Sequence, residues 1–329
     1  MWQSTDAIPE RKSSPFLSVI IPTYNRSSVL LKCLSALLDQ TVPGTEYEIL
    51  VVDDGSSDRT VDIVEEVRVA APVEVYCLRQ NHKGPAAARN SAIRNAQGDV
   101  LLFIGDDILA SPTLLTEHAQ WHRTHPEDNV AVLGYVTWSS EILLTPFMRF
   151  LSEHSDMQFA YGIIQDEKDI SYQHFYTSNI SLKRTFLLAN GLFDEDFPDA
   201  GQEDIELGYR LERKGLRIVF NRKAVGYHLH PMDLESFCRK MEIIGFAAEI
   251  FNSKHPEVAL NTAFVAIPRW QITIKHLLAR ICLPLGIMAF QLDRRLLYQC
   301  YKSVLWFHLW RGHHAYLNGT TGERGHGLD

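Results

Sequence analysis

Short apolar runs alternate with stretches of helical periodicity from residue 17 to residue 124. Runs rich in β-branched residues are typical of buried parallel strands. The predicted strands are Leu17–Ile21, Glu48–Val52, Val73–Leu78 and Val100–Ile104. The predicted helices are Ser27–Gln40, Asp58–Val67, Gly84–Ala96 and Ser111–Thr124. This alternation predicts an α/β fold, in which a mostly parallel sheet is flanked by helices.

The pattern becomes less regular after this point. Further predicted strands are Val130–Trp138, Phe175–Leu182, Arg217–Phe220 and Ala224–His228. A helix is expected over Glu203–Lys214, whereas Glu141–Lys168 reads as an irregular, aromatic-rich segment. From Asp233 onward the chain reads as helices that break near Pro256 and Pro268. We therefore expect a disordered leader (1–15), a catalytic domain (16–232) and a C-terminal helical region (233–329).

Composition narrows the classes of protein. The 329 residues carry a net charge of −8, so no basic field is available for nucleic acid and we expect no such partner. The five cysteines are scattered without a C-x-x-C motif, which favours reduced thiols and a cytoplasmic location. Residues 1–15 lack the apolar core of a signal peptide. Because Ile281–Leu292 is about half as long as a spanning helix, we expect no transmembrane segment.

Acidic pairs follow two of the predicted strands. Asp54 follows the second strand and can accept a hydrogen bond from a uracil-like N–H, although an acid there can also cap the next helix. Asp106 and Asp107 follow the fourth strand, where open α/β sheets keep their ligand crevice. Two adjacent carboxylates repel each other, and an oxygen-binding cation such as Mg²⁺ or Mn²⁺ would relieve this repulsion. The alternative for this pair is an exposed turn.

The turn after the first strand argues against a dinucleotide fold. It reads Pro22-Thr23-Tyr24-Asn25-Arg26 and lacks the G-x-G-x-x-G pattern. Its side chains can instead line a base pocket, or simply form a strand-to-helix turn.

A third acidic pair, Glu203 and Asp204, opens a predicted helix. A carboxylate at a helix start in a cleft is suited to act as a general base. The helix dipole should lower the pKa of Asp204, which we therefore expect to be ionised at neutral pH. Complementarity to the helix dipole is the alternative reason for acids here.

Six strings occur in a fixed order: FLSVIIPTYNR, ILVVDDGSSD, GPAAARN, DVLLFIGDD, GQEDIEL and VGYHLH. From Phe16 to His230 they resemble the family-2 inverting glycosyltransferases, which have the GT-A (nucleotide-diphospho-sugar transferase-like) fold. The resemblance implies a nucleotide-binding set composed of Pro22, Thr23, Tyr24, Arg26, Asp54, Lys83, Arg89 and Asp106. Within this set Arg89, or Lys83, would meet the diphosphate, and Asp106 the ribose.

The resemblance also implies a metal site and a base. Asp107 would bind the metal together with a histidine, although Ile108 replaces the third acid of the family's D-x-D. His228 and His230 face the same way along a strand, so spacing does not choose between them, and we favour His228. Asp204 would be the general base. Further residues expected on the acceptor or donor-sugar side are Glu203, Asp194 and Trp138.

The hypothesis is a metal-dependent inverting transferase that moves one sugar from a nucleotide-sugar donor, UDP-linked by preference. The acceptor would be a bacterial surface glycan or a lipid-linked saccharide. Processive relatives carry Q-x-x-R-W, but here Ala266 precedes Arg269-Trp270, which favours single transfer. The alternatives are a sugar nucleotidyltransferase and an inactive scaffold. Between Trp270 and Trp310, basic and aromatic residues suggest peripheral contact with the inner membrane face; a core-sealing or dimer role is the alternative.

Overall fold

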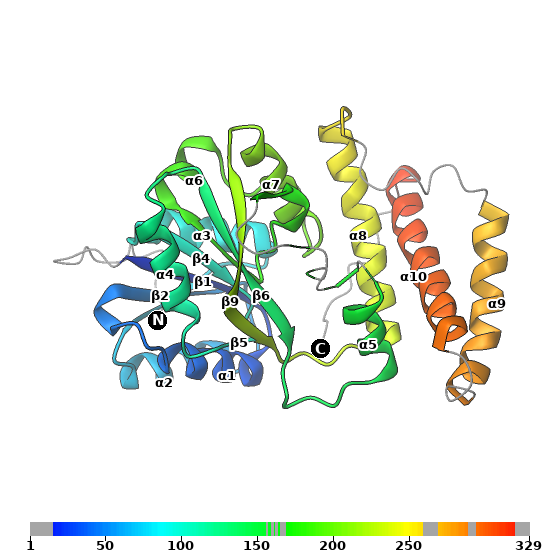
Figure 1. Ribbon diagram of the computed structural model, residues 1–329, viewed down its shortest axis with the longest axis horizontal. Helices are drawn as coiled ribbons and strands as arrows, with labels where there is room; N and C mark the ends of the chain where they lie inside the picture. Colours follow the sequence, from blue (N-terminus) through cyan, green and yellow to red (C-terminus); the bar gives the residue numbers. More distant parts are fainter. Residues whose placement is uncertain are drawn as a thin grey trace.

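The computed structural model describes residues 16–155, 157–158, 161, 164, 169–258, 269–288 and 294–319. The leader predicted for residues 1–15 lies outside the described residues. Within them, the chain forms an α/β unit followed by three long helices (Figure 1).

The described residues form one mixed sheet of nine strands. In spatial order it runs β3-β2-β1-β4-β8-β6-β9-β5, with β7 beside β9. The strands are β1 Leu17–Thr23, β2 Tyr47–Asp53, β3 Glu74–Arg79, β4 Val100–Ile104, β5 Ile108–Ala110, β6 Val130–Trp138, β7 Asp169–Ile170, β8 Asn179–Lys183 and β9 Arg217–His228. Every residue of β2 and β4 is buried, because helices cover both faces there, as their continuous apolar runs predicted.

Strand direction brings four strand ends to one edge. β1, β2, β3 and β4 are mutually parallel, and β8 is antiparallel to both β4 and β6. Since β6 is parallel to β9, the strands β1, β2, β4 and β9 all point the same way. Their carboxyl ends meet at one edge of the sheet, which is where ligands bind in open α/β folds.

Helices cover the sheet on both faces. α1 Ser27–Leu38 and α2 Thr60–Ala70 lie on one face, and α3 Pro85–Asn95 lies on the other (Figure 1). The remaining helices of this unit are α4 Leu114–Thr124, α6 Arg184–Asn190 and α7 Glu203–Glu212, with short 3₁₀ turns η1 Gly44–Glu46 and η2 Tyr172–His174. Gly84 adopts a φ of +90° directly before α3, and Pro85 occupies the first turn, where its missing N–H costs nothing.

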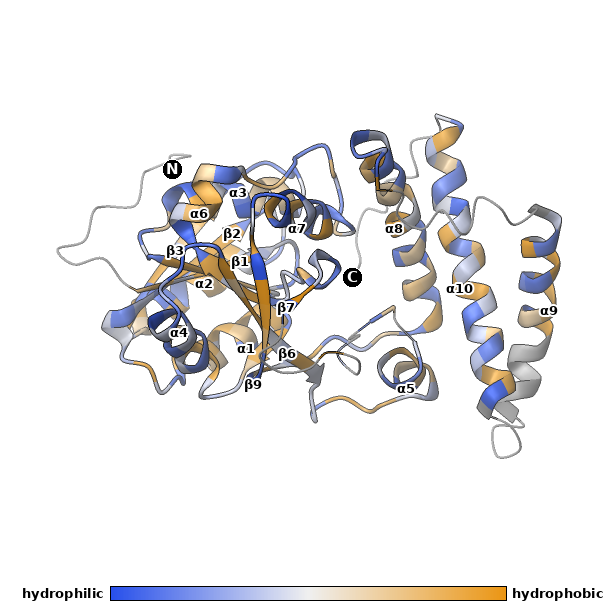
Figure 2. Ribbon diagram, turned by 45° about the horizontal axis from the view of Figure 1, so that its top comes forward, coloured by the Kyte–Doolittle hydropathy of each residue, from blue (hydrophilic) through white to orange (hydrophobic). Residues whose placement is uncertain are grey.

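Three helices follow the sheet: α8 Leu234–Lys254, α9 Arg269–Met288 and α10 Arg294–Leu317. α10 lies between α8 and α9 in both views (Figures 1 and 2). α8 also packs against α7, through a cluster that joins Phe197 and Tyr209 to Ala247 and Phe251. The helical region is therefore attached to the helix that carries the predicted base.

Three details differ from the sequence prediction. The segment expected to be irregular contains α5 Pro146–Glu153, whose Thr145 cap accepts a 3.2 Å bond from the Met148 amide. Its apolar face is only two turns long and its partners lie far along the chain, in α8 and α10. The strand predicted from Phe175 begins at Asn179, after η2. The strands predicted at 217–220 and 224–228 are the two halves of β9, and an irregularity in its pairing with β6 falls between them.

Candidate active site

Asp54 anchors the loop at the ends of β2 and β3. Its carboxylate accepts bonds from the amides of Lys83 (2.9 Å) and Gly84 (2.8 Å) and from Gln80 Nε2 (2.7 Å). His82 Nδ1 lies 2.9 Å from the same carboxylate, and its ring stacks on Tyr24 at 4.2 Å. A buried acid and a stacked ring pair thus lie side by side at this edge of the sheet. The sequence interpretation missed Gln80 and His82, although His82 directly precedes Lys83.

Asp106 is held between β1 and the start of α1. Thr23 Oγ1 donates a 2.7 Å bond to one carboxylate oxygen, and Arg26 Nη1 donates a 2.8 Å bond to the other. The Asp54 amide in turn donates to the Thr23 carbonyl at 3.0 Å, which links the two acidic groups. Burial and the neighbouring Asp107 charge raise the pKa of Asp106 to about 6, although Arg26 opposes the shift.

Arg26 also contacts the second acid of the pair. Its Nη2 atom lies 3.0 Å from Asp107 Oδ2 and 3.2 Å from His230 Nδ1. The repulsion between Asp106 and Asp107 is therefore already offset by one guanidinium bridging both. A divalent cation is therefore not the only positive charge that can relieve this repulsion.

His228 meets Asp107 because of strand register. β5 and β9 are antiparallel with Ile108 opposite His228, so the residue before Ile108 reaches the end of β9. His228 Nε2 lies 3.4 Å from Asp107 Oδ2. Burial alone would raise the pKa of Asp107. Attraction to His228 and Arg26 outweighs burial and lowers this pKa to about 2. Burial lowers the pKa of His228 to about 4, which leaves a neutral imidazole beside an ionised carboxylate.

These two groups are a donor set that a divalent cation can use. Among the described residues, no cluster of three or more His, Cys, Asp or Glu side chains could hold a metal ion. A cation at Asp107 and His228 would therefore need further ligands from a diphosphate and from water. Mg²⁺ and Mn²⁺ are commonly bound in this way, through one or two protein groups and substrate phosphates. The residues present therefore fit such an ion.

The third acidic pair opens α7, as predicted. Glu203 is buried, and its carboxylate accepts bonds from Arg89 Nη1 (2.8 Å) and from the Gly201 amide (2.7 Å). Gln202, which lies between Gly201 and Glu203, adopts a φ of +82°. Residues other than glycine rarely adopt this left-handed conformation. Strain of this kind is often found at functional sites.

The Asp204 side chain is partly exposed, and its carboxyl group holds a proton more tightly than an ordinary aspartate does. Its Oδ1 atom accepts a 2.9 Å bond from the Ile205 amide. Burial and the adjacent Glu203 charge raise its pKa from the usual 3.8 to about 7, although Arg89 opposes the shift. The expectation that the helix dipole lowers this pKa was wrong, because desolvation and a like charge outweigh the dipole. A carboxyl with a pKa near 7 is well matched to proton transfer at neutral pH.

Lys240 on α8 is the cation that sequence reasoning missed. Its Nζ atom donates a 3.1 Å bond to Gln158 and lies 5.6 Å from the Phe237 ring centroid. Its charge acts on Asp107, Asp204 and Glu203, so it lies within electrostatic range of both acidic pairs. Burial lowers the pKa of Lys240. The C-terminal helical region thus contributes a charged group to the site, and no local motif marks it.

The remaining predicted residues have varied surroundings. The Lys83 side chain is exposed, and the Arg89 guanidinium is committed to Glu203, so diphosphate contact by either stays a prediction. Asp194 forms a 2.8 Å ion pair with Lys254 of α8. Trp138 ends β6, is buried, and meets the His228 ring edge-on at 5.4 Å, which favours packing over sugar stacking.

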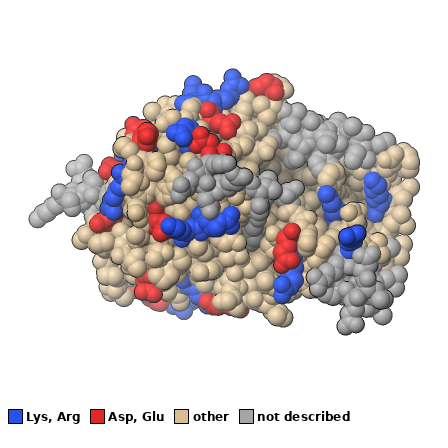
Figure 3. Space-filling model, viewed as in Figure 1, with Lys and Arg blue, Asp and Glu red and all other residues tan. Residues whose placement is uncertain are grey.

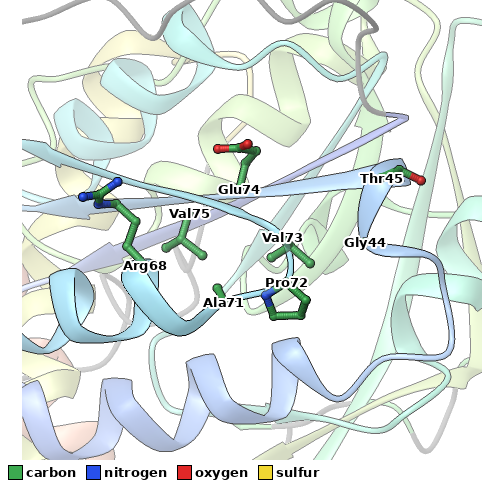
Figure 4. A pocket seen from close by; sticks show the side chains of 8 residues that line it. All are labelled: Gly44, Thr45, Arg68, Ala71, Pro72, Val73, Glu74 and Val75. Carbon is green, nitrogen blue, oxygen red and sulfur yellow. The ribbon is translucent and has the colours of Figure 1, made fainter.

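A pocket elsewhere on the sheet has a different character (Figure 4). It lies between η1 and the turn that joins α2 to β3, and is lined in part by Gly44, Arg68, Pro72 and Glu74. η1 directly precedes β2 and Glu74 begins β3, so the pocket lies at the amino ends of these strands, opposite the edge that carries the acids. The pocket is therefore separate from the candidate site.

Solved structures share this fold. A mannosyltransferase from Pyrobaculum calidifontis, in complex with GDP-Man and Mn²⁺, aligns over 96% of this chain and 90% of its own, with a TM-score of 0.64 and 20% identity. Residues 1–349 of Staphylococcus aureus TarS, in complex with UDP, align over 92% of this chain and 91% of that one, with a TM-score of 0.52 and 21% identity. The fold is that of the GT-A transferases.

Sequence comparison gives the family. The family model "Glycosyl transferase family 2" matches residues 18–187, so the chain belongs to this family of glycosyltransferases. It is 28% identical over 282 residues to an uncharacterized glycosyltransferase of Bacillus subtilis (72% of this chain, 70% of that protein). It is 30% identical over 242 residues to validoxylamine A glucosyltransferase of Streptomyces hygroscopicus subsp. limoneus (64% of this chain). The chain spans 51% of the length of this second relative.

Proposed function

We propose that this glycosyltransferase uses a divalent cation, inverts the anomeric centre, and moves one sugar from a nucleotide-sugar donor to an acceptor hydroxyl. The observation that carries the proposal is a continuous series of contacts along one sheet edge. It runs from Asp54 through Thr23 and Asp106 to Arg26 and Asp107. Beyond these contacts, the Lys240 charge attracts both Asp107 and Asp204. These contacts support a common site for Asp54, Asp106 and Asp107, and we propose that Asp204 faces the same site.

The nucleoside half would lie between Asp54 and Tyr24. The Tyr24–His82 stack offers an aromatic face to a base. Asp54 already accepts bonds from Gln80, Lys83 and Gly84, so a base N–H would replace one of these donors, the Gln80 side chain being the one that can turn away. An acceptor of this kind suits uracil, and we therefore favour a UDP-sugar. Asp106, already hydrogen-bonded by Thr23 and Arg26, is the candidate for the ribose hydroxyls.

Asp107 and His228 would hold Mn²⁺ or Mg²⁺. When bound, such an ion stabilises negative charge on the departing diphosphate. His230 hydrogen-bonds Arg26 instead of Asp107, which supports His228 as the histidine ligand.

Asp204 is the proposed general base. As a carboxylate it accepts the proton of the acceptor hydroxyl, whose oxygen then forms a bond to C1 of the donor sugar. The bond from C1 to the diphosphate oxygen breaks on the opposite face, and its electron pair leaves with the nucleoside diphosphate. Glu203 is a positioning residue, because Arg89 and the Gly201 amide fix its carboxylate and with it the first turn of α7.

The acceptor class is proposed to be a bacterial surface glycan or a lipid-linked saccharide, reached from the cytoplasmic side of the membrane. Among the residues that the structure describes, no helix is both long enough and apolar enough to cross a bilayer.

A donor panel tests the proposal. The purified chain is incubated with UDP-, GDP- and dTDP-sugars and Mn²⁺, and release of nucleoside diphosphate is measured. UDP release that requires the metal and accelerates with acceptor is expected, and NMR of the product should show an inverted anomeric centre. Pyrophosphate as the product would identify a nucleotidyltransferase instead. Calorimetry that detects no nucleotide binding, with or without Mn²⁺, would indicate an inactive scaffold.

A further inference from the structure

The outermost C-terminal helix turns an apolar face to solvent. α9 packs on α10, and α10 separates it from α8 (Figures 1 and 2). The exposed large hydrophobic side chains of α9 are Trp270 (63% exposed), Ile274 (47%), Leu277 (55%), Leu278 (57%) and Ile281 (65%). They recur at i, i+4, i+7, i+8 and i+11, so they share one face of the helix. Contiguous apolar surface of this kind marks an interaction site.

The opposite face of α9 packs against α10. Ile272 and Ala279 are buried toward α10, and the His276 ring stacks on Phe307 of α10 at 3.8 Å. The exposed stripe is therefore not needed to close the core, which was one alternative for these residues.

The basic residues around the exposed face of α9 indicate which kind of partner it would contact. Neither α9 (Arg269–Met288) nor α10 (Arg294–Leu317) contains an Asp or Glu, in a chain of net charge −8. Their basic residues are Arg269, Lys275, Arg280, Arg294, Arg295, Lys302 and Arg311. Lys275 and Arg280 are exposed and flank the apolar stripe on its two sides. On the face drawn in Figure 3, the charged side chains over this end of the molecule are basic.

An apolar stripe between cations matches an anionic lipid surface, in which acyl chains lie beneath negative headgroups. A second copy of the chain fits less well, because a symmetric contact through this stripe would bring the same lysine and arginine side chains together.

We propose that the Trp270–Ile281 face of α9 lies in the interfacial layer of an anionic membrane and anchors the protein to the bilayer surface. This deepens the proposed function, because it would hold the site near a lipid-linked acceptor. Binding to lipid does not itself require sugar transfer, so the two proposals can fail separately.

Vesicle flotation of the full chain tests the anchor. Wild type should float with phosphatidylcholine vesicles that contain one third phosphatidylglycerol, and should stay in the dense fraction with phosphatidylcholine alone. Lys275→Glu/Arg280→Glu should weaken partitioning by roughly 30-fold or more, since each basic residue near such a surface contributes about fivefold. Leu277→Ser/Leu278→Ser should weaken it by about tenfold or more.

Matched controls keep the result specific. Leu143→Ser/Leu188→Ser removes exposed apolar side chains elsewhere, and Lys214→Glu/Lys223→Glu reverses exposed charges elsewhere. Both should float like wild type, and all variants should retain wild-type circular dichroism. In wild type, brominated lipid should quench tryptophan fluorescence, and Trp270→Phe should lose most of this quenching.

Three results would overturn the inference. Wild type that stays dense with anionic vesicles excludes a membrane anchor, whether or not nucleotide sugars are turned over. Equal flotation of the α9 variants and their controls would show that lipid binds elsewhere. A wild-type dimer by light scattering that becomes monomeric in Leu277→Ser/Leu278→Ser, without flotation of either protein, would assign the face to self-association.

Discussion

Arg89 on α3 donates a 2.8 Å hydrogen bond to Glu203 on α7, and both side chains are buried. The pair joins two helices that are more than a hundred residues apart along the chain. It fixes the first turn of α7, which carries Asp204. A buried ion pair that loses one partner leaves an uncompensated charge, so we expect this contact to support both stability and the position of Asp204, the proposed base.

Arg89→Met is expected to lower the free energy of unfolding by about 3 to 5 kcal/mol, because Glu203 would remain buried without its partner. Chemical denaturation measures this. The double variant Arg89→Met/Glu203→Gln should lie closer to wild type than Arg89→Met does. In the exposed Arg59–Glu66 pair, Arg59→Met should change stability by less than about 1 kcal/mol. An Arg89→Met effect as small as this control would contradict the role given to the pair.

Asp204→Asn should reduce turnover by roughly 10²-fold or more, the usual scale for loss of a general base, and leave donor affinity nearly unchanged. The amide keeps the shape of the side chain but cannot take a proton. Initial rates and calorimetric donor titration measure the two quantities. Asp39→Asn, an exposed acid on the protein surface, is the matched control. Normal turnover in Asp204→Asn would assign the base elsewhere.

The pH profile should report the raised pKa of Asp204. The base works as a carboxylate, so kcat/KM should fall by about tenfold per pH unit below about 7 and level off above it. Stability should move in the opposite direction. Since the folded state holds this proton more tightly than the unfolded state, the stabilising contribution is full below pH 3.8 and is lost as the pH rises through about 7.

Asp204→Asn should consequently be more stable than wild type above pH 7, by about 1 to 2 kcal/mol. This is less than the full pKa shift would give, because the side chain is partly open to solvent. Thermal unfolding at several pH values tests it. A wild-type rate profile that stays flat from pH 5 to about 8 would contradict the raised pKa.

Chelation should abolish tight nucleotide binding, and added Mn²⁺ should restore it. Asp107→Asn and His228→Ala should each weaken Mn²⁺-dependent UDP binding by about tenfold or more in calorimetry. His230→Ala should have a smaller effect, because His230 contacts Arg26. His154→Ala, an exposed histidine, serves as control. A larger loss in His230→Ala than in His228→Ala would reverse the assignment of the ligand.

Lys240→Met should move the lower limb of the pH profile upward, since a nearby cation favours the carboxylate form of Asp204. Turnover at pH 7 should fall with it, and Lys240→Arg should retain most of both properties. Lys275→Met, on the exposed side of α9, controls for loss of a lysine from the helical region. If Lys240→Met alters stability but leaves the pH profile of turnover unchanged, Lys240 has only a structural role.

The sequence by itself determined the alternating strands and helices, the acids that end β2 and β4, and the acids that open α7. These features depend on local periodicity and on residues adjacent in the chain. The sequence also placed His228 and His230 on one side of a strand end, but it could not choose between them. It missed α5 and Lys240, whose partners lie in distant segments.

Tertiary structure decided the rest, because it sets distances between groups that the chain order leaves undefined. The β5–β9 register brings Asp107 to His228 across more than a hundred residues. Folding places Arg26 between two acids, which partly offsets the repulsion that the sequence suggested. Desolvation beside Glu203 raises the pKa of Asp204, which reverses the expectation from the helix dipole. Burial and charge proximity are properties of the folded chain, so they set the protonation of the candidate site residues in ways that the sequence order does not.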